Sequence, residues 1–140
     1  MKIYFAGSIR GGREDQEFYN ALIAYLQTKG TVLTEHIGLA SLSSHGESGN
    51  EQTIYSRDLN WLLQADVIIA EVSSPSLGVG YEISFAETHK KPIICLYRLQ
   101  DGKKLSAMIR GNKNLTVADY KDIAQAKKII DEFLAKIIKF

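Results

Sequence analysis

Cysteine is almost absent from this chain. Its 140 residues include only one, Cys95, so no disulfide bond can form within the chain. Disulfides are rare in reducing compartments, and we therefore expect a cytoplasmic protein. Cys95 lies in the apolar segment 93–97, a context that favours a buried strand residue over a nucleophile.

Long apolar runs and a strong charge imbalance are also missing. No segment is long and apolar enough to cross a bilayer, and the N-terminus lacks the pattern of a secretory signal. The net charge is only +1, whereas proteins that coat nucleic acid are usually strongly basic. We therefore expect neither a membrane nor a nucleic acid as a partner. With 45% apolar and 24% charged residues and no internal repeat, the composition predicts one domain spanning residues 1–140.

What the chain does contain is an alternation of strand-like and helix-like segments. It predicts a three-layer, doubly wound (Rossmann-like) α/β fold, with a five-stranded parallel sheet and helices on both faces. Ligands of such folds bind at the carboxyl ends of the strands, here the loops after Ala6, Glu71 and Tyr97. A serine- and glycine-rich loop is expected at 38–50. The expected strands are 2–6, 31–34, 66–71, 92–97 and 115–118, and the expected helices are 14–29, 51–64, 77–90 and 121–139.

The first strand runs into a glycine-rich turn, Gly7-Ser8-Ile9-Arg10-Gly11-Gly12-Arg13. Glycines let the backbone approach an anion closely, and the free amides at the start of the following helix favour negative charge. Ser8 adds a hydroxyl donor, and Arg10 adds a planar guanidinium suited to phosphate. The pattern is neither a P-loop nor a dinucleotide motif. A tight turn with a solvated arginine explains it equally well.

A second glycine-rich turn, Ser76-Leu77-Gly78-Val79-Gly80-Tyr81-Glu82, begins the helix expected at 77–90. Ser76 suits the N-cap position, where its hydroxyl and the first free amides could hold a phosphate. Gly78 and Gly80 each cost a helix up to about 1 kcal/mol against alanine, and close approach of a ligand would explain them. Glu82 is partly surrounded by apolar neighbours, so it could serve as a nucleophile or base. A first-turn glutamate favoured by the helix dipole is the alternative.

A carboxylate also interrupts the apolar face of the helix expected at 51–64. At about 100° per residue, Asp58 falls inside that face, where its burial is costly unless it is paired or faces a cavity. A structural ion pair or a position at the helix rim would account for it as well. Tyr4, in the middle of a strand, is expected in the core. Ser106 lies in the segment 105–111, which we expect to be a loop without a motif of its own.

The three histidines, His36, His45 and His89, show no spacing typical of a metal site. We expect His45 and His89 to be solvated, whereas His36 follows a strand near the expected ligand edge and could contact a ligand. No metal and no organic cofactor is expected.

Six motifs follow one another along nearly the whole chain, and together they resemble the nucleoside 2-deoxyribosyltransferase superfamily, in particular its N-glycosidases of deoxynucleoside monophosphates. The serine-rich loop and the C-terminal helix differ from that pattern, which leaves the preferred base open. The motifs are YFAGSIRGGRED (4–15), VLTEH (32–36), DLNWL (58–62), ADV (65–67), PSLGVGYE (75–82) and LSAMIRG (105–111).

The resemblance implies a homodimer and assigns roles that spacing alone does not give. Glu82 matches the nucleophile, Asp58 the acid that handles the leaving base, and Tyr4 a tyrosine beside the nucleophile. Ser8, Arg10 and Ser76 match residues around a 5′-phosphate. Ser106 matches a serine that reaches the phosphate from the neighbouring subunit, and Ile9 a residue of the base pocket. The full substrate-binding set implied is Gly7, Ser8, Ile9, Arg10, Gly11, Gly12, Arg13, Ser76, Gly78, Ser106, Ala107 and Met108.

The expected reaction is hydrolysis of the N-glycosidic bond of 2′-deoxynucleoside 5′-monophosphates, through a covalent glycosyl-enzyme on Glu82. The products would be the free base and 2-deoxyribose 5-phosphate. Three alternatives stay open: transfer of the deoxyribosyl group to another base, nucleotide binding without turnover, and hydrolysis of ribonucleotides such as CMP or AMP.

Overall fold

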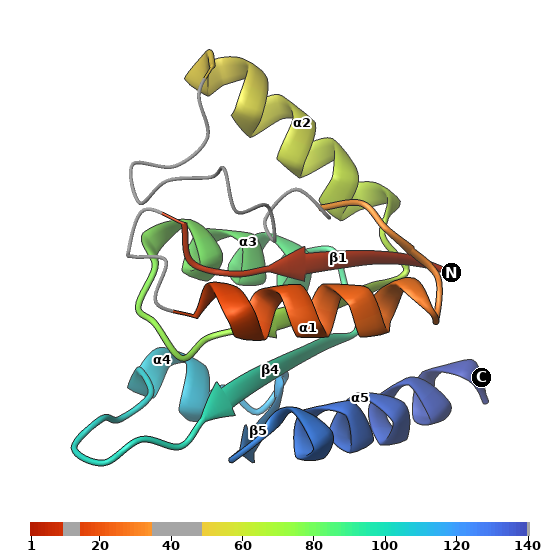
Figure 1. Ribbon diagram of the computed structural model, residues 1–140. Coiled ribbons are helices and arrows are strands. Elements are labelled where there is room, and N and C mark those ends of the chain that lie inside the picture. The colour runs from red at the N-terminus through yellow and green to blue at the C-terminus, as the bar shows by residue number, and fades with distance from the viewer. Residues whose placement is uncertain (10–14, 35–48, 140) are drawn as a thin grey trace.

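The computed structural model describes residues 1–9, 15–34 and 49–139. Its centre is a five-stranded sheet with the strand order β2-β1-β3-β4-β5, in which every neighbouring pair is parallel (Figure 1). The predicted fold class is confirmed. The strands are β1 (Lys2–Ala6), β2 (Thr31–Val32), β3 (Val67–Glu71), β4 (Ile93–Arg98) and β5 (Thr116–Tyr120).

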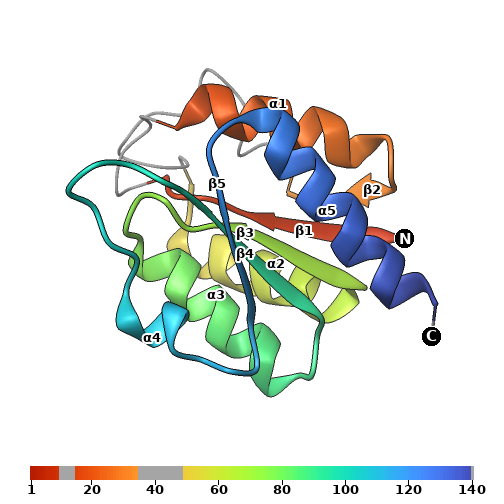
Figure 2. The same ribbon diagram turned by 90° about the horizontal axis from the view of Figure 1, so that it is seen from below.

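Helices cover both faces of this sheet. Figure 2 shows α1 and α5 on one face and α2, α3 and α4 on the other. None of the helices in the described part of the chain is both long and apolar enough to traverse a membrane. The helices are α1 (Gln16–Gln27), α2 (Glu51–Gln64), α3 (Leu77–Thr88), α4 (Ala107–Arg110) and α5 (Ile123–Ile138).

The central strands are buried on both faces, as their continuous apolar sequences require. Every residue of β3 is buried, and Cys95 on β4 is fully buried, as predicted. Because side chains alternate along a strand, β1 divides its residues between two apolar layers. Phe5 packs with α1 and α5, whereas Tyr4 packs in the layer beneath α2 and α3. This alternation delivers Tyr4 to the face where both candidate carboxylates lie.

Two local expectations differ from the structure. The second strand is only two residues long, although Leu33 N still donates to Ile3 O at 2.9 Å. The segment 105–111, expected to be a loop, contains the helix α4, and Ser106 Oγ accepts from Met108 N at 3.2 Å at its start. A single helical turn is too short for apolar periodicity to reveal it. The expected loop at 38–50 lies almost wholly outside the described residues.

Candidate active site

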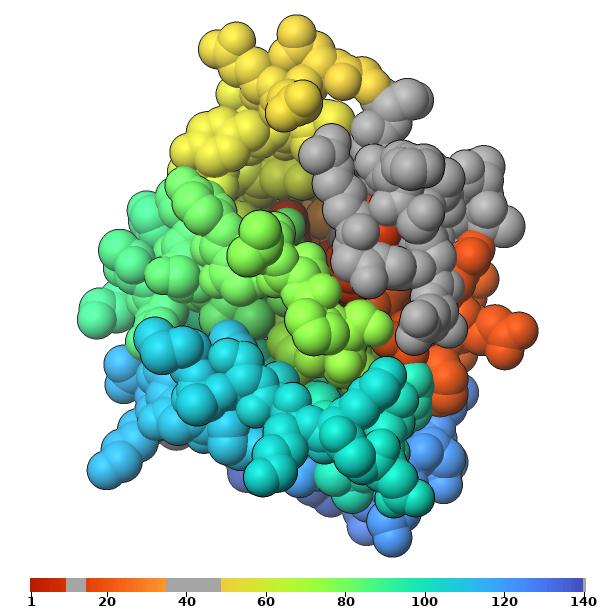
Figure 3. All heavy atoms as spheres, turned by 90° about the vertical axis from the view of Figure 1, so that its left-hand side faces the viewer, coloured from red at the N-terminus to blue at the C-terminus, as the bar shows by residue number. Residues whose placement is uncertain are grey.

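A cleft of about 520 Å³ opens between α2 and α3, at the carboxyl end of β1. Figure 3 shows the hollow between these two helices, with atoms of the first residues at its floor. Its position agrees with the sheet edge at which doubly wound folds bind ligands. The described residues that line it are Gly7, Ile9, Glu51, Ile54, Tyr55, Asp58, Leu59, Ser76, Leu77, Gly78, Val79, Tyr81 and Glu82.

The second glycine-rich turn forms one wall of the cleft. Ser76 is the N-cap of α3, and its Oγ accepts from Val79 N at 3.2 Å. A Cβ added at Gly78 would lie 3.9 Å from both Glu82 Oε1 and Ser76 Oγ, and one at Gly80 would meet nothing within 4 Å. Among the described residues there is thus enough space for a side-chain methyl group at both positions, so packing does not explain either glycine. At Gly78, which faces the cleft, the missing side chain leaves room for a ligand.

Glu82 presents its carboxyl group to the interior of the cleft. Its Oε2 atom is buried and has no hydrogen-bond partner among the described residues. Burial raises the pKa of Glu82 to about 8; a hydrogen bond from Tyr4 opposes this rise, and the negative charge of Asp58 adds to it. A poorly hydrated carboxyl with an unused oxygen is suited to attack an electrophilic centre or to stabilise a positive charge.

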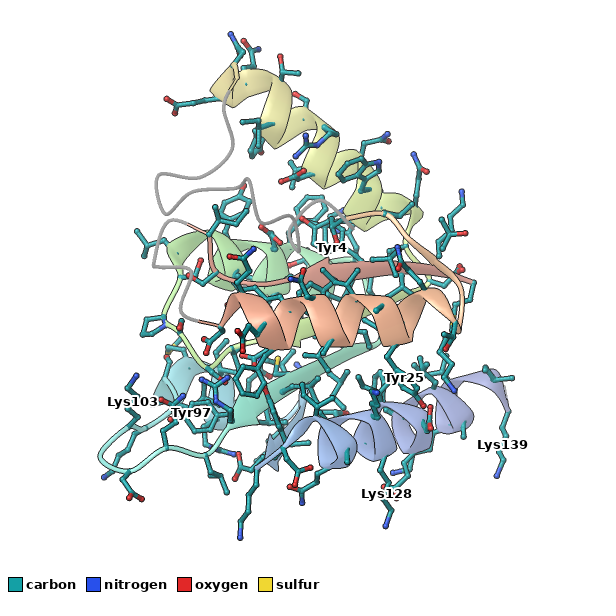
Figure 4. The ribbon with its side chains drawn as sticks, viewed as in Figure 1. Tyr4, Tyr25, Tyr97, Lys103, Lys128 and Lys139 are labelled. Carbon is teal, nitrogen blue, oxygen red and sulfur yellow. The ribbon has the colours of Figure 1, made fainter. Side chains whose placement is uncertain are left out.

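Tyr4 supports Glu82 from the sheet. Its side chain is buried, and Figure 4 shows it on the α2 side of β1. Burial and the carboxylates of Glu82 and Asp58 raise the pKa of Tyr4 far above its usual range. The phenol therefore keeps its proton and donates it in a hydrogen bond to Glu82.

Asp58 lies on the opposite wall, on α2. Its Oδ1 accepts from Arg57 Nη2 at 2.9 Å and from Arg57 Nε at 3.0 Å, and its side chain is 24% exposed. The Arg57 guanidinium in turn lies 4.6 Å from the centre of the Trp61 ring. Asp58 therefore has an ion-pair partner and also lines the cleft, where its negative charge contributes to the raised pKa of Glu82.

Gly7 and Ile9, in the described part of the first glycine-rich turn, line the end of the cleft at β1. A Cβ at Gly7 would come within 3.1 Å of Tyr19 Cζ and 3.2 Å of Phe5 Cε1, so a side chain there would push these rings apart by a few tenths of an ångström. Ser8 N donates to the Tyr19 hydroxyl at 3.0 Å. The Ser8 hydroxyl is buried without a hydrogen-bond partner among the described residues, and the neighbouring Ile9 lines the cleft. A buried hydroxyl of this kind suits a polar ligand group.

Several predicted residues fall outside this description. The other members of the first turn and two histidines belong to the parts of the chain that the structure does not describe: Arg10, Gly11, Gly12, Arg13, His36 and His45. His89 is exposed at the end of α3, where its Nδ1 lies 2.8 Å from Phe85 O. Within residues 1–9, 15–34 and 49–139, no group of three or more His, Cys, Asp or Glu side chains could hold a metal ion.

Ser106, Ala107 and Met108 do not join the cleft of their own chain, as far as its lining is described. They form the exposed start of α4, where Met108 is 82% exposed.

Sequence analysis missed the aromatic rim of the cleft. The hydroxyl groups of Tyr55 and Tyr81 lie 3.3 Å apart, and their rings pack edge to face with centroids 6.2 Å apart. The signal was the helical spacing of Glu51, Tyr55 and Asp58, which repeats at three and four residues and so places them on one side of α2.

Comparisons with known proteins agree with this architecture. The family model described as Nucleoside 2-deoxyribosyltransferase matches residues 3–123. The 5-hydroxymethyl-dUMP N-hydrolase of Tetraodon nigroviridis is 46% identical over 140 residues, which cover 96% of this chain and 98% of that protein. The protein of the same name from Rattus norvegicus is 49% identical over 136 residues, covering 94% and 83%. The solution structure of BlsM superposes with a TM-score of 0.73 at 22% identity, covering 98% and 91%. The chain belongs to the nucleoside 2-deoxyribosyltransferase family.

Proposed function

We propose that the protein hydrolyses the N-glycosidic bond of 2′-deoxynucleoside 5′-monophosphates and releases the free base and 2-deoxyribose 5-phosphate. The observation that carries this proposal is the Glu82 carboxyl group, buried with an unpartnered oxygen in the same cleft as Asp58. The names of the relatives from Tetraodon nigroviridis and Rattus norvegicus, both 5-hydroxymethyl-dUMP N-hydrolases, support the reaction class.

The proposed chemistry follows that of retaining glycosidases. As the bond between C1′ and the base nitrogen breaks, its electron pair leaves with the base and positive charge develops on the sugar. The Glu82 carboxylate stabilises this charge and bonds C1′. Asp58, on the facing wall, protonates the departing base or holds it by a hydrogen bond. A water molecule then gives a proton to Asp58 and attacks C1′, which breaks the bond between C1′ and Glu82, releases the sugar phosphate and restores the Glu82 carboxylate.

The phosphate provides binding energy away from the reacting atoms. We infer that Ser76 and the free amides at the start of α3 bind this phosphate from one wall of the cleft. Ser8 is assigned to the same phosphate by the family resemblance; its hydroxyl is buried between Gly7 and Ile9, which line the cleft, although Ser8 itself is not among the described lining residues. Arg10, outside the described residues, is proposed as the cationic partner on the basis of the family resemblance. A phosphate held at a fixed distance from Glu82 orients C1′ for attack, and such orientation can lower a barrier by about 7–11 kcal/mol in well-aligned systems.

We also propose a preference for the deoxy sugar and a homodimer. A wall formed by the buried Tyr4–Glu82 pair would exclude a 2′-hydroxyl beside C1′, and a deoxy sugar reaches the cationic transition state more easily. Leu77 on α3 is 97% exposed and Met108 on α4 is 82% exposed. Large exposed apolar side chains beside a cleft are typical of an interface, and a second subunit there could bring its Ser106 to the phosphate.

One assay tests the reaction and its rivals together. The protein is incubated with the common deoxynucleoside monophosphates, with 5-hydroxymethyl-dUMP and with matched ribonucleotides, and free base is detected by chromatography. Release of base that Glu82→Ala abolishes supports the proposal. Glu87→Gln is the matched control, because Glu87 is also on α3 but accepts hydrogen bonds from Asn112 and Asn114 instead of facing the cleft.

The rivals give different outcomes in the same assay. With an excess of a second base, a deoxyribosyltransferase yields the exchanged nucleotide instead of the free sugar phosphate. A binding module retains nucleotide affinity in both wild type and Glu82→Gln and releases no base. Equal rates with ribonucleotides and deoxynucleotides contradict the proposed role of the Tyr4–Glu82 pair.

A further inference from the structure

A buried ion pair connects the beginning of α1 to the carboxyl end of β4. Asp15, the residue before α1, is only 2% exposed, and its carboxylate contacts the Arg98 guanidinium at the end of β4. Its second oxygen, Oδ2, accepts from Ser74 Oγ at 2.7 Å. An aspartate at this position usually accepts from the free amides of its own helix, but this side chain caps none of them. The carboxylate is used for contacts between elements instead.

Arg98 is itself fixed from several sides. Its guanidinium lies 3.9 Å from the centre of the Phe18 ring, and its backbone N donates to Ser73 Oγ at 2.8 Å. Ser73 Oγ in turn donates to the buried Glu71 at 3.0 Å, and the Tyr120 hydroxyl donates to the same carboxylate. The ion pair therefore sits on a polar network anchored at the ends of β3, β4 and β5.

The first turn of α1 also contacts Ser8, in the first glycine-rich segment. Tyr19 N donates to Asp15 O at 2.9 Å, and the Tyr19 hydroxyl accepts from Ser8 N at 3.0 Å. Ser74, which donates to Asp15, comes two residues before Ser76. The first turn of α1 is thus connected to both serine-bearing turns, one through Tyr19 and one through the Asp15 carboxylate.

We propose that the Asp15–Arg98 ion pair is a positioning device that fixes the turn of Ser8 relative to the turn of Ser76 and so sets the affinity for a phosphorylated sugar. This inference rests on the proposed function, in which these two serines bind the 5′-phosphate. Neither Asp15 nor Arg98 is among the described residues that line the cleft, so both act through the serine-bearing turns.

The test compares two variants that break the connection in different ways. Ser74→Ala removes only the hydroxyl that joins Asp15 to the second turn. Asp15→Asn or Arg98→Met alone would leave an unpaired charge inside the protein and could prevent folding. The second variant therefore combines Asp15→Asn with Arg98→Met, which removes both charges. The measurements are kcat and KM with a turned-over deoxynucleotide and, without turnover, the Kd of 2-deoxyribose 5-phosphate by calorimetry.

We expect KM and the product Kd to rise together by about tenfold in both variants, with kcat changed less than about threefold. Tyr25→Phe is the matched control, because it removes the 2.6 Å hydrogen bond from α1 to Asp131 on α5, away from the cleft (Figure 4). Unchanged KM and Kd in the two test variants, or an equal rise in Tyr25→Phe, would overturn the inference. Wild type that releases no base from any deoxynucleotide would instead refute the proposed function, and the product Kd would still decide the positioning role.

Discussion

The Tyr4 hydroxyl on β1 hydrogen-bonds the Glu82 carboxyl on α3, and this contact opposes the effect of burial on the acid. Burial alone favours the protonated form of Glu82, which cannot act as a nucleophile. A donor that contacts the carboxylate lowers its pKa, and the remaining value is about 8. The proposed mechanism therefore depends on Tyr4 for the ionisation of Glu82.

Replacement of Tyr4 by phenylalanine tests this dependence. Without the donor, the pKa of Glu82 should rise by about one further unit, the value of a hydrogen bond to a charged group. The acidic limb of kcat/KM should then move to higher pH by the same amount, as measured by the rate of base release between about pH 5 and pH 10.

Tyr97→Phe is the control for this shift. The Tyr97 hydroxyl is also buried, but it has no hydrogen-bond partner among the described residues, and Tyr97 lies on β4 beside α4 (Figure 4). Its loss should leave the acidic limb in place. A limb that moves to lower pH in Tyr4→Phe, or that moves equally in both variants, contradicts the assignment.

The raised pKa of Glu82 also predicts how stability depends on pH. Between the ordinary value of 4.5 and about 8, the unfolded chain releases this proton while the folded protein keeps it. The free energy of unfolding should therefore fall as the pH rises through this window. Glu82→Gln removes the ionisable group, so at pH 9 its free energy of unfolding should exceed that of wild type by up to about 4 kcal/mol. Below pH 4.5 the free energies of unfolding of the two proteins should differ little.

Urea unfolding of wild type and Glu82→Gln across this pH range measures the difference directly. The same comparison with Glu87→Gln is the control, because hydrogen bonds from Asn114 and Asn112 lower the pKa of Glu87. If the stability gain of Glu82→Gln is independent of pH, the Glu82 carboxyl titrates normally in the folded protein.

The two helix glycines of α3 give a matched pair of substitutions. An added methyl group meets only ordinary contacts at Gly78 and open space at Gly80, so alanine should stabilise the helix by about 0.4–1 kcal/mol at either position. Of these two glycines, only Gly78 is among the described residues that line the cleft. We therefore expect Gly78→Ala to raise KM about tenfold while Gly80→Ala leaves it unchanged.

Thermal unfolding and steady-state kinetics separate the two effects. Each variant should gain about 1–4 °C in Tm, since 1 kcal/mol corresponds to about 2–4 °C in a chain near this length. A wild-type KM in Gly78→Ala would mean that no ligand approaches this backbone, and the phosphate site at the start of α3 would have to be abandoned.

Much of this architecture could be predicted from the sequence because its signals are local. The helix predicted at 51–64 has the same bounds in the structure, where the Asn50 side chain accepts from Thr53 N at 3.2 Å at its start and the backbone is extended at Ala65. The buried strand β3 is apolar from Val67 to Ala70 and ends at Glu71, so it is equally plain. In contrast, α4 is one turn long and carries no periodicity to detect.

The site was less predictable because it depends on contacts between distant segments. Spacing alone left both a structural and a functional interpretation open for Asp58 and for Glu82. Only the family resemblance gave them roles. The ion pair of Asp15 with Arg98 joins residues 83 positions apart, so no pattern along the chain predicts it. Tertiary packing alone brings these side chains together.

The proposed homodimer is tested by mixing two impaired variants. Glu82→Gln lacks the nucleophile, and Ser106→Ala lacks the serine expected to reach across the interface. If each active site combines Glu82 of one subunit with Ser106 of the other, a mixed dimer contains one site in which both residues are intact.

Mixing equal amounts after reversible dissociation should restore roughly a quarter of the wild-type sites, because half of the dimers are mixed and each has one intact site. If Ser106 acts within its own chain, the mixture shows only the average of the two variants. The rate of base release before and after mixing distinguishes these outcomes, and size-exclusion chromatography establishes that the subunits have exchanged.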